Sequence, residues 1–322
     1  MRKALAGCGA ALGVLATLLA HSAQRGSAPV DVIVGVATSF GLPIDDLPPQ
    51  AFSAAVDGRP IVIDAVRQTR APLTVALLID VSGSMNTLRW VDLRRGKIQL
   101  PTLSEQMLSE VVVDGFRDAL LPADRARLSG ISASPWIGPV VAHTREAFEA
   151  TLEDLLAHRR DPSNVTRSSP VWDAAGTLVD LLRSEPQRRL VVIVTDGKVN
   201  ANLLSPEKLA ERAVEARVAI AVVDESQAIL MRQDRAPTAA VRPDRALRWV
   251  AEATGGAYLA DSVLRGAPEP ADPAGLVSRA IEGHRHAYTL TLTVPDDGRP
   301  HTLEVSVTRP DAAVRAPAFI HR

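Results

Sequence analysis

Two nearly continuous apolar segments, residues 74–79 and 189–195, are each followed directly by an aspartate. Such runs are typical of strands that a sheet buries on both faces. Around them, the apolar spacing predicts helices at 106–120, 144–156, 170–183, from 205, 245–254 and 273–282, and strands at 127–132, 137–141, 218–223 and 258–260. Strands that alternate with helices indicate a mostly parallel sheet covered on both sides. The predicted fold class is therefore α/β, a doubly wound sheet within residues 72–285.

The segment before this region has a β-rich pattern. Residues 30–36, 51–55 and 60–66 predict strands, and Val56-Asp57-Gly58-Arg59 predicts the turn between the last two. We interpret residues 25–71 as a small β-rich lead-in segment, because the stretch is too short to predict a separate domain.

The segment after the α/β region also changes to a period of two. Apolar and polar residues alternate over residues 290–294 and 303–307, and Pro295-Asp296-Asp297-Gly298 supplies turn residues between them. This pattern predicts an antiparallel hairpin, joined by a final strand near residues 316–320. Residues 286–322 are therefore interpreted as a C-terminal β tail.

The first residues have the order of a secretory signal. Arg2 and Lys3 precede an apolar run over residues 4–20, and small residues near Ala23 offer a cleavage site. We expect removal of residues 1–24, a secreted or periplasmic location in a bacterial envelope, and no membrane span after cleavage. A retained anchor is the alternative. Lipidation of Cys8 fits less well, because this single cysteine lies near the start of the apolar run.

Composition narrows the class of partner. The chain is 46% hydrophobic and 23% charged, which is typical of a folded globular protein. Its net charge of -1 gives no positive field for nucleic acid, and 3% aromatic residues offer no visible platform for stacking bases. We therefore expect no nucleic-acid partner.

Oxygen-bearing side chains follow the first buried strand. Asp80, Ser82 and Ser84 leave residues 74–79 as alternate residues of a turn, and Gly83 lets the backbone bend. This pattern can direct one carboxylate and two hydroxyls to a point at the carboxyl edge of the sheet, where open α/β folds bind ligands. A carboxylate with hydroxyl and water oxygens suits Mg²⁺ or Mn²⁺.

Two further segments bring oxygen atoms to the same edge. The second buried strand ends in Thr195-Asp196-Gly197, which places the Asp196 carboxylate there. Ser169 lies just before Pro170, the expected first residue of a helix, where its hydroxyl can point back over the sheet. Ser168 or Thr166 can take its place if the register of the loop differs.

Together these residues resemble the metal-ion-dependent adhesion site of the von Willebrand factor A domain. In that family, Asp-x-Ser-x-Ser, a later Thr and a later Asp hold one divalent ion. The matching residues here are Asp80, Ser82, Ser84, Asp196 and, where the family usually has Thr, Ser169. The resemblance covers about residues 72–285 and implies bound Mg²⁺ or Mn²⁺. The flanking β segments also resemble those of bacterial secreted proteins related to this family.

The resemblance implies a function as well. A partner protein that presents an acidic residue would complete the coordination of the ion. We therefore expect an extracytoplasmic, metal-dependent protein-binding module for adhesion or assembly, and not an enzyme. The alternative is a metal-independent structural or scaffold module of the cell envelope, in which the same polar residues only brace loops.

A metal-dependent phosphohydrolase is the less favoured alternative. An enzyme with an aspartyl nucleophile also has Asp at the end of its first strand, but it needs a second Asp two residues later. This chain has Ser82 there, and the sequence has no phosphate-binding loop or serine-nucleophile elbow.

Three other groups have plainer interpretations. Arg89, Arg94, Arg95 and Lys97 form either a basic rim for an acidic partner or an ordinary solvated surface, and the sequence leaves both open. His284 and His286 are expected on one face of a strand as a solvated pair. Asp173 is expected to make contacts around the helix and not to bind the ion.

Overall fold

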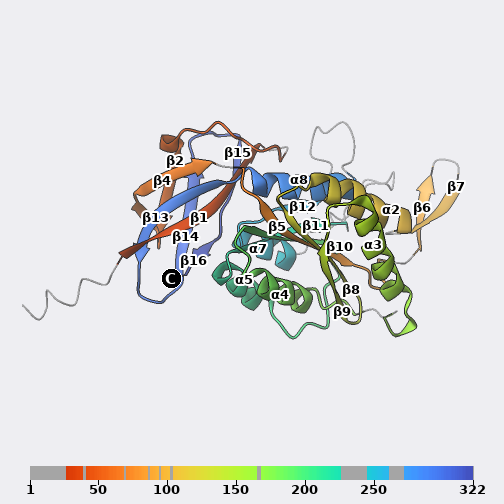
Figure 1. Cartoon of the computed structure of the whole chain (residues 1–322). Helices are drawn as coiled ribbons and strands as arrows, with labels where there is room; N and C mark the ends of the chain where they lie inside the picture. The colour runs from red at the N-terminus through yellow and green to blue at the C-terminus, as the bar shows by residue number, and fades with distance from the viewer. Residues whose placement is uncertain are drawn as a thin grey trace, which may run out of the picture.

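The computed structural model describes residues 27–38, 41–68, 70–85, 88–93, 96–101, 104–164, 168–225, 245–260 and 272–321. The expected signal over residues 1–24, with Cys8, lies outside these residues, as do the side chains of Arg89, Arg94, Arg95 and Lys97. Within the described part of the chain, no helix is long and apolar enough to cross a membrane. Figure 1 shows an α/β unit beside a smaller unit made of strands.

A six-stranded sheet forms the centre of the α/β unit, in the order β12-β11-β10-β5-β8-β9. Its strands are β5 (Leu73–Asp80), β8 (Arg125–Ile131), β9 (Pro135–Val141), β10 (Arg188–Thr195), β11 (Val218–Asp224) and β12 (Tyr258–Ala260). All pairs are parallel except β8 with β9, and every residue of β5 is buried. The predicted doubly wound, mostly parallel sheet is confirmed.

Helices cover both faces of this sheet (Figure 1). One face packs against α3 (Arg145–Arg160), α8 (Pro273–Arg285) and α2 (Glu105–Ser109), which continues through a π-helical turn, η2 (Glu110–Phe116), into η3 (Arg117–Ala119). The other face packs against α4 (Val171–Leu182), α5 (Pro206–Glu215) and α7 (Arg245–Ala253). The hydroxyl of Thr144 caps α3 at the start of the predicted helix, whereas Pro170 precedes α4 instead of forming its first residue.

Two short strands, β6 (Leu88–Leu93) and β7 (Gly96–Pro101), pair antiparallel and project from the α/β unit beyond α2 (Figure 1). They lie in the loop that follows the Asp80 turn. A 3-10 turn, η4 (Pro162–Asn164), follows α3.

The flanking segments combine into one β-sandwich of two four-stranded sheets, β15-β1-β13-β4 and β16-β14-β2-β3. Its strands are β1 (Ser27–Thr38), β2 (Phe52–Val56), β3 (Arg59–Ile61), β4 (Ile63–Gln68), β13 (Tyr288–Pro295), β14 (His301–Val307), β15 (Ala312–Arg315) and β16 (Phe319–Ile320), with a short 3-10 turn η1 (Pro49–Ala51). β1 pairs antiparallel with β13, so Val30 lies opposite Leu292. The sequence analysis did not predict this pairing between the two flanks.

The predicted hairpin of residues 290–294 and 303–307 is wrong. β13 and β14 belong to different sheets and contribute Leu292 and Leu303 to the same core from opposite sides. Alternating apolar residues reveal which face of a strand is buried, but not its partner. Two neighbouring predictions are confirmed: β16 pairs with β14, and Asp57-Gly58 turns between β2 and β3 with positive φ angles of 50° and 72°.

The expectation for the histidine pair is also wrong. His284 lies in the last turn of α8 and His286 directly follows it, so neither residue is in a strand. The helix continues past residue 282 because Arg285 is anchored: its guanidinium donates to both carboxylate oxygens of Asp124, at 3.1 and 2.7 Å. His286 has an acidic partner, since its Nδ1 lies 2.7 Å from Oδ2 of Asp45.

Candidate metal site

The carboxylate of Asp80 lies fully buried at the carboxyl end of β5. Its Oδ1 accepts a hydrogen bond of 3.0 Å from the backbone N–H of Ser82. Its Oδ2 accepts hydrogen bonds from the hydroxyls of Ser169, at 2.8 Å, and Thr195, at 3.0 Å. Three segments that are far apart in the sequence therefore converge on one carboxylate.

Burial raises the pKa of Asp80, because desolvation penalises the charged carboxylate. Hydrogen bonds from Ser82 and Ser169 lower the pKa in part, and the negative charge of Asp196 adds to the rise. Within the described part of the chain, no basic side chain contacts Asp80. Among the described residues, Asp80 itself therefore has no cationic partner that would stabilise its ionised form.

The turn after β5 brings the two serines of the motif together. The Oγ atoms of Ser82 and Ser84 are 3.2 Å apart, and Ser82 is almost completely buried. The backbone N–H of Met85 donates to the carbonyl of Ser82, which closes the turn. Both hydroxyls thus belong to the cluster that contains Asp80.

The loop before α4 is held in a way that positions Ser169. Its N–H donates to the side-chain oxygen of Asn200 at 3.0 Å, and the N–H of Asn200 donates to the carbonyl of Ser169 at 3.1 Å.

The carboxylate of Asp173 accepts from the N–H groups of Leu203 and Leu204, at 2.9 and 2.7 Å. The structure places Ser169 against Asp80, whereas the alternative Thr166 lies outside the described residues. Asp173 braces the adjoining loop, as expected.

Asp196 follows β10 and has a fully buried side chain. Its Oδ2 accepts from the ammonium group of Lys198 at 2.8 Å, and its Oδ1 accepts from the backbone N–H of the same residue at 3.1 Å. The side chain of Lys198 is 56% exposed, so this cation lies between Asp196 and solvent. The sequence analysis identified Asp196 but not its lysine partner.

Thr195 is the second residue that the sequence analysis missed. Val194 pairs with Ile79 in the parallel register of β10 and β5, which puts Thr195 beside Asp80 at the sheet edge. Its position directly before Asp196, at the end of a buried strand, was the available signal. Because its hydroxyl donates to Asp80, Thr195 holds the carboxylate in place together with Ser169.

The atoms gathered at this edge suit a hard divalent cation. They are the carboxylates of Asp80 and Asp196 and the hydroxyls of Ser82, Ser84, Ser169 and Thr195. The described residues include no group of three or more His, Cys, Asp or Glu side chains arranged for a metal ion. An oxygen-only set with few carboxylates fits Mg²⁺ or Mn²⁺ better than Zn²⁺, which favours nitrogen and sulfur.

Comparisons with protein-family models and with curated proteins gave no match. Among solved structures, an aerotolerance-related membrane protein from Bacteroides fragilis is 14% identical, with 66% of this chain and 98% of that chain covered and a TM-score of 0.42. BatB from Bacteroides thetaiotaomicron is 15% identical, with the same coverage and TM-score. The SpRpn10 VWA domain is 14% identical, with 64% and 94% covered and a TM-score of 0.36. The fold class itself follows from the sheet order and the two helical layers described above.

Proposed function

We propose that this chain is an extracytoplasmic protein-binding module, for adhesion or assembly, that uses a divalent cation to bind an acidic residue of its partner. The observation that supports this proposal best is the buried Asp80 carboxylate, which accepts from two hydroxyls and a backbone N–H and contacts no basic side chain among the described residues. The residues that would hold Mg²⁺ or Mn²⁺ are Asp80, Ser82, Ser84, Ser169 and Asp196. When bound, the cation would supply positive charge and exchangeable positions for an incoming carboxylate.

The chemistry of the cluster favours binding over hydrolysis. The position two residues after Asp80, where an aspartyl-nucleophile phosphohydrolase needs a second acid, has the hydroxyl of Ser82, which lies 3.2 Å from that of Ser84. A serine hydroxyl cannot replace a carboxyl group as acid and base near neutral pH. Asp196 is held by Lys198 through both of its oxygens. We therefore propose a non-enzymatic role.

Titration of the purified protein with Mn²⁺ tests the proposal. Enhanced relaxation of water protons reports bound Mn²⁺ that retains coordinated water, and added acetate should reduce the enhancement by replacing that water. Asp80→Asn should abolish Mn²⁺ binding, because the variant retains the size of the side chain but removes the buried charge. Asp180→Asn, which changes an exposed carboxylate paired with Arg212, should bind as the unmodified protein does.

Two results of this titration would contradict the proposal. If Asp80→Asn binds Mn²⁺ as tightly as the unmodified protein, the ion does not occupy this site. If Mn²⁺ binds at Asp80 but acetate leaves the relaxation unchanged, the cation has a structural role and does not bridge to a carboxylate.

A metal-independent scaffold is the second candidate, and one observation favours it. Asp80 accepts three hydrogen bonds and Asp196 is paired with Lys198, so the cluster is satisfied by groups of the protein itself. In that case neither EDTA nor Mg²⁺ should change the melting temperature, because no ion binds the folded state in preference to the unfolded state. Under the metal-dependent proposal, Mg²⁺ should raise it.

A further inference from the structure

A cavity of about 320 Å³ lies at the junction of the α/β unit and the β-sandwich. Its walls include Arg188 and Arg189 at the start of β10 and Val218 at the start of β11, together with β1 and β16 of the sandwich. Asp80 and Thr195, by contrast, are the last residues of their strands. The cavity and the candidate metal site therefore lie at opposite ends of the central sheet.

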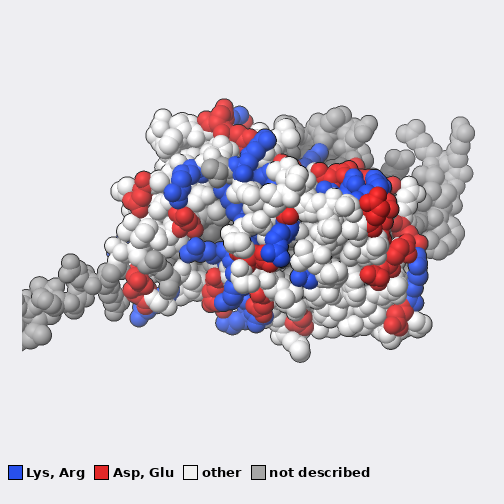
Figure 2. All heavy atoms as spheres, in the orientation of Figure 1, with Lys and Arg blue, Asp and Glu red and all other residues white. Residues whose placement is uncertain are grey.

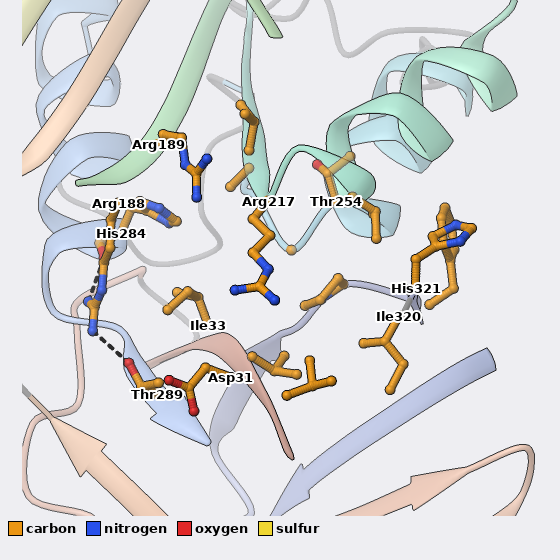
Figure 3. A pocket seen from close by; sticks show the side chains of 18 of the residues that line it. Asp31, Ile33, Arg188, Arg189, Arg217, Thr254, His284, Thr289, Ile320 and His321 are labelled. Atoms are coloured by element: carbon orange, nitrogen blue, oxygen red, sulfur yellow. Dashed lines mark hydrogen bonds between the residues drawn. The ribbon is translucent and has the colours of Figure 1, made fainter. Parts of the chain in front are cut away.

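Guanidinium groups dominate the chemistry of this cavity. In Figure 3 the side chains of Arg189 and Arg217 point into it from the α/β unit. The charge of Arg217 lowers the pKa of Arg189, in addition to the larger effect of burial, so the two groups lie within reach of each other. Space-filling Figure 2 shows basic side chains gathered along the same boundary between the two units, with acidic ones among them.

The hydrogen-bonding capacity of these two arginines is only partly used. Arg189 donates to the carbonyl of Arg183 at 2.7 Å, but its buried Nε has no hydrogen-bond partner. Within the described part of the chain, the guanidinium of Arg217 has neither an ion pair nor a hydrogen bond. Arg188 is different, because its guanidinium donates to the carbonyl of Ala287 at 2.9 Å and the hydroxyl of Thr289 at 3.0 Å. Arg188 thus holds the wall of the cavity in place, and the guanidinium groups of Arg189 and Arg217 are available to bind a ligand.

Two acidic side chains lie near these three arginines and do not cancel their charge. Glu185 pairs with Arg125 at 2.9 Å, and its charge also raises the pKa of Arg189. Asp31 is on the sandwich side, where its carboxylate accepts from Arg67 at 3.2 Å and from Thr291 at 2.6 Å. Burial, with Arg188 and Arg285 nearby, lowers the pKa of His284 to about 3, so its ring is neutral at physiological pH. The buried Nε2 of His321 has no hydrogen-bond partner. The cavity is therefore net positive.

Most of the remaining lining is apolar, and the polar side chains of Gln187 and Thr254 in it form hydrogen bonds within the protein. The apolar part includes Ile33 and Ile320 from the sandwich and Val214 from α5. Figure 3 shows Ile33 below Arg189 and beside the guanidinium of Arg217, and Ile320 lower in the view. A volume of about 320 Å³ is at the small end of the range for ligand pockets. Apolar side chains beside paired cations complement a small amphipathic anion.

We propose that this cavity binds a small organic carboxylate, with its carboxylate against Arg217 and Arg189 and its aliphatic part against Ile33 and Ile320. Arginine is suited to this ligand, because the planar guanidinium matches the two oxygens of a carboxylate. The carboxylate of Asp31, which also lines the cavity, repels a doubly charged phosphate ester more strongly than a singly charged carboxylate. This site is separate from the metal-binding function proposed above and does not depend on it.

Titration of the isotopically labelled full chain with hexanoate, followed by amide NMR spectra in the presence of EDTA, tests the proposal. Saturable shifts are expected for the amides of Ile33, Val218 and Gly255, with the amide of Ser82 unaffected. Hexylamine, which has the same aliphatic part with the opposite charge, should cause no saturable shifts. Inorganic phosphate should bind more weakly than hexanoate, because it has no apolar part.

Two matched variants test whether the positive charge of Arg217 binds hexanoate. Arg217→Gln should weaken hexanoate binding about tenfold, the amount expected for loss of one charge-assisted hydrogen bond. Arg279→Gln, which changes an exposed arginine on α8, should bind hexanoate as the unmodified chain does. The amide spectrum of each variant checks that it is folded. Equal binding by Arg217→Gln, equal binding of hexylamine or of phosphate, or no saturable shift with hexanoate would each overturn the proposal.

Discussion

The ammonium group of Lys198 lies 2.8 Å from Oδ2 of Asp196, so one of the predicted metal ligands already has a cationic partner. Asp196 is buried at the sheet edge, whereas Lys198 reaches it from the solvent side. A divalent ion that binds Asp196 must therefore compete with this lysine or share the carboxylate with it. The lysine tunes the affinity of the site in the proposed function.

Replacing Lys198 with Met should accordingly raise the affinity for Mn²⁺ by up to about fivefold, the amount expected when a partly exposed competing charge worth at most about 1 kcal/mol is removed. Isothermal titration calorimetry measures the change. Lys208→Met is the matched control, because Lys208 forms an exposed pair with Glu211 on α5. Weaker Mn²⁺ binding by Lys198→Met would show that the lysine supports the site and does not compete.

Ser169 offers a graded test of the hydroxyl in the α4 loop. Ser169→Ala removes the hydrogen bond of 2.8 Å to Asp80 and should weaken Mn²⁺ binding about tenfold, as for a lost hydrogen bond to a charged group. Ser169→Thr retains the hydroxyl and should bind at least as tightly as the unmodified chain. Calorimetry measures the affinity of both variants for Mn²⁺, and circular dichroism confirms that they are folded. Equal affinities of the Ala and Thr variants would remove Ser169 from the ligand set.

Removing one partner of the buried pair of Arg285 and Asp124 should be strongly destabilising. Their side chains are 2% and 0% exposed, and Asp124 also accepts from the N–H of Leu73 at the start of β5. Arg285→Ala leaves the carboxylate buried without its partner and should lower the free energy of unfolding by about 3–5 kcal/mol. Urea denaturation measures this change. The exposed pair of Arg67 and Asp31 is the control, and Arg67→Ala should cost at most about 1 kcal/mol.

His301 predicts how the stability of the β-sandwich depends on pH. Its Nδ1 lies 2.7 Å from Asp57 and its Nε2 lies 3.0 Å from Asp297. The hydrogen bond to Asp57, and after it the one to Asp297, raises the pKa of His301 against the opposing effect of burial.

Because the pKa is higher in the folded state, the stabilisation is complete below the unfolded value of about 6.5 and is lost as pH rises through the folded value. The melting temperature of the unmodified chain should therefore fall relative to that of His301→Gln between pH 6 and pH 9. Parallel pH profiles of the two proteins would contradict this assignment.

The sequence was informative about the fold wherever burial on both faces left a continuous apolar run. The strands around Leu77 and Val192 could be located in this way, and the aspartates that end them marked the candidate site. The sandwich was harder, because the alternating residues of β13 fit a hairpin with β14 as well as the observed pairing with β1. Pairing between distant segments depends on the whole fold and leaves no local signal.

In the candidate site, too, some residues could be proposed from local sequence and others depend on the whole fold. Asp80, Ser82, Ser84, Ser169 and Asp196 could be proposed from the sequence because they lie at or shortly after the ends of buried strands, or just before a helix. Thr195 and Lys198 required the register of β10 against β5 and the path of the loop after it. Both lie within two residues of Asp196, but the sequence does not show which neighbouring side chains turn towards a carboxylate and which turn away.

The pairing of β1 with β13 determines the order in which the chain can fold. β1 precedes the α/β unit in the chain, but its partners β13 and β15 follow the whole unit. Local contacts form sooner than those that close a very long loop. The α/β unit can therefore fold first, while β1 stays unpaired and its apolar face stays exposed. Only a chain that includes these later strands can close the sandwich. A chain that ends within the α/β unit would expose unpaired strand edges, which are prone to aggregation or proteolysis.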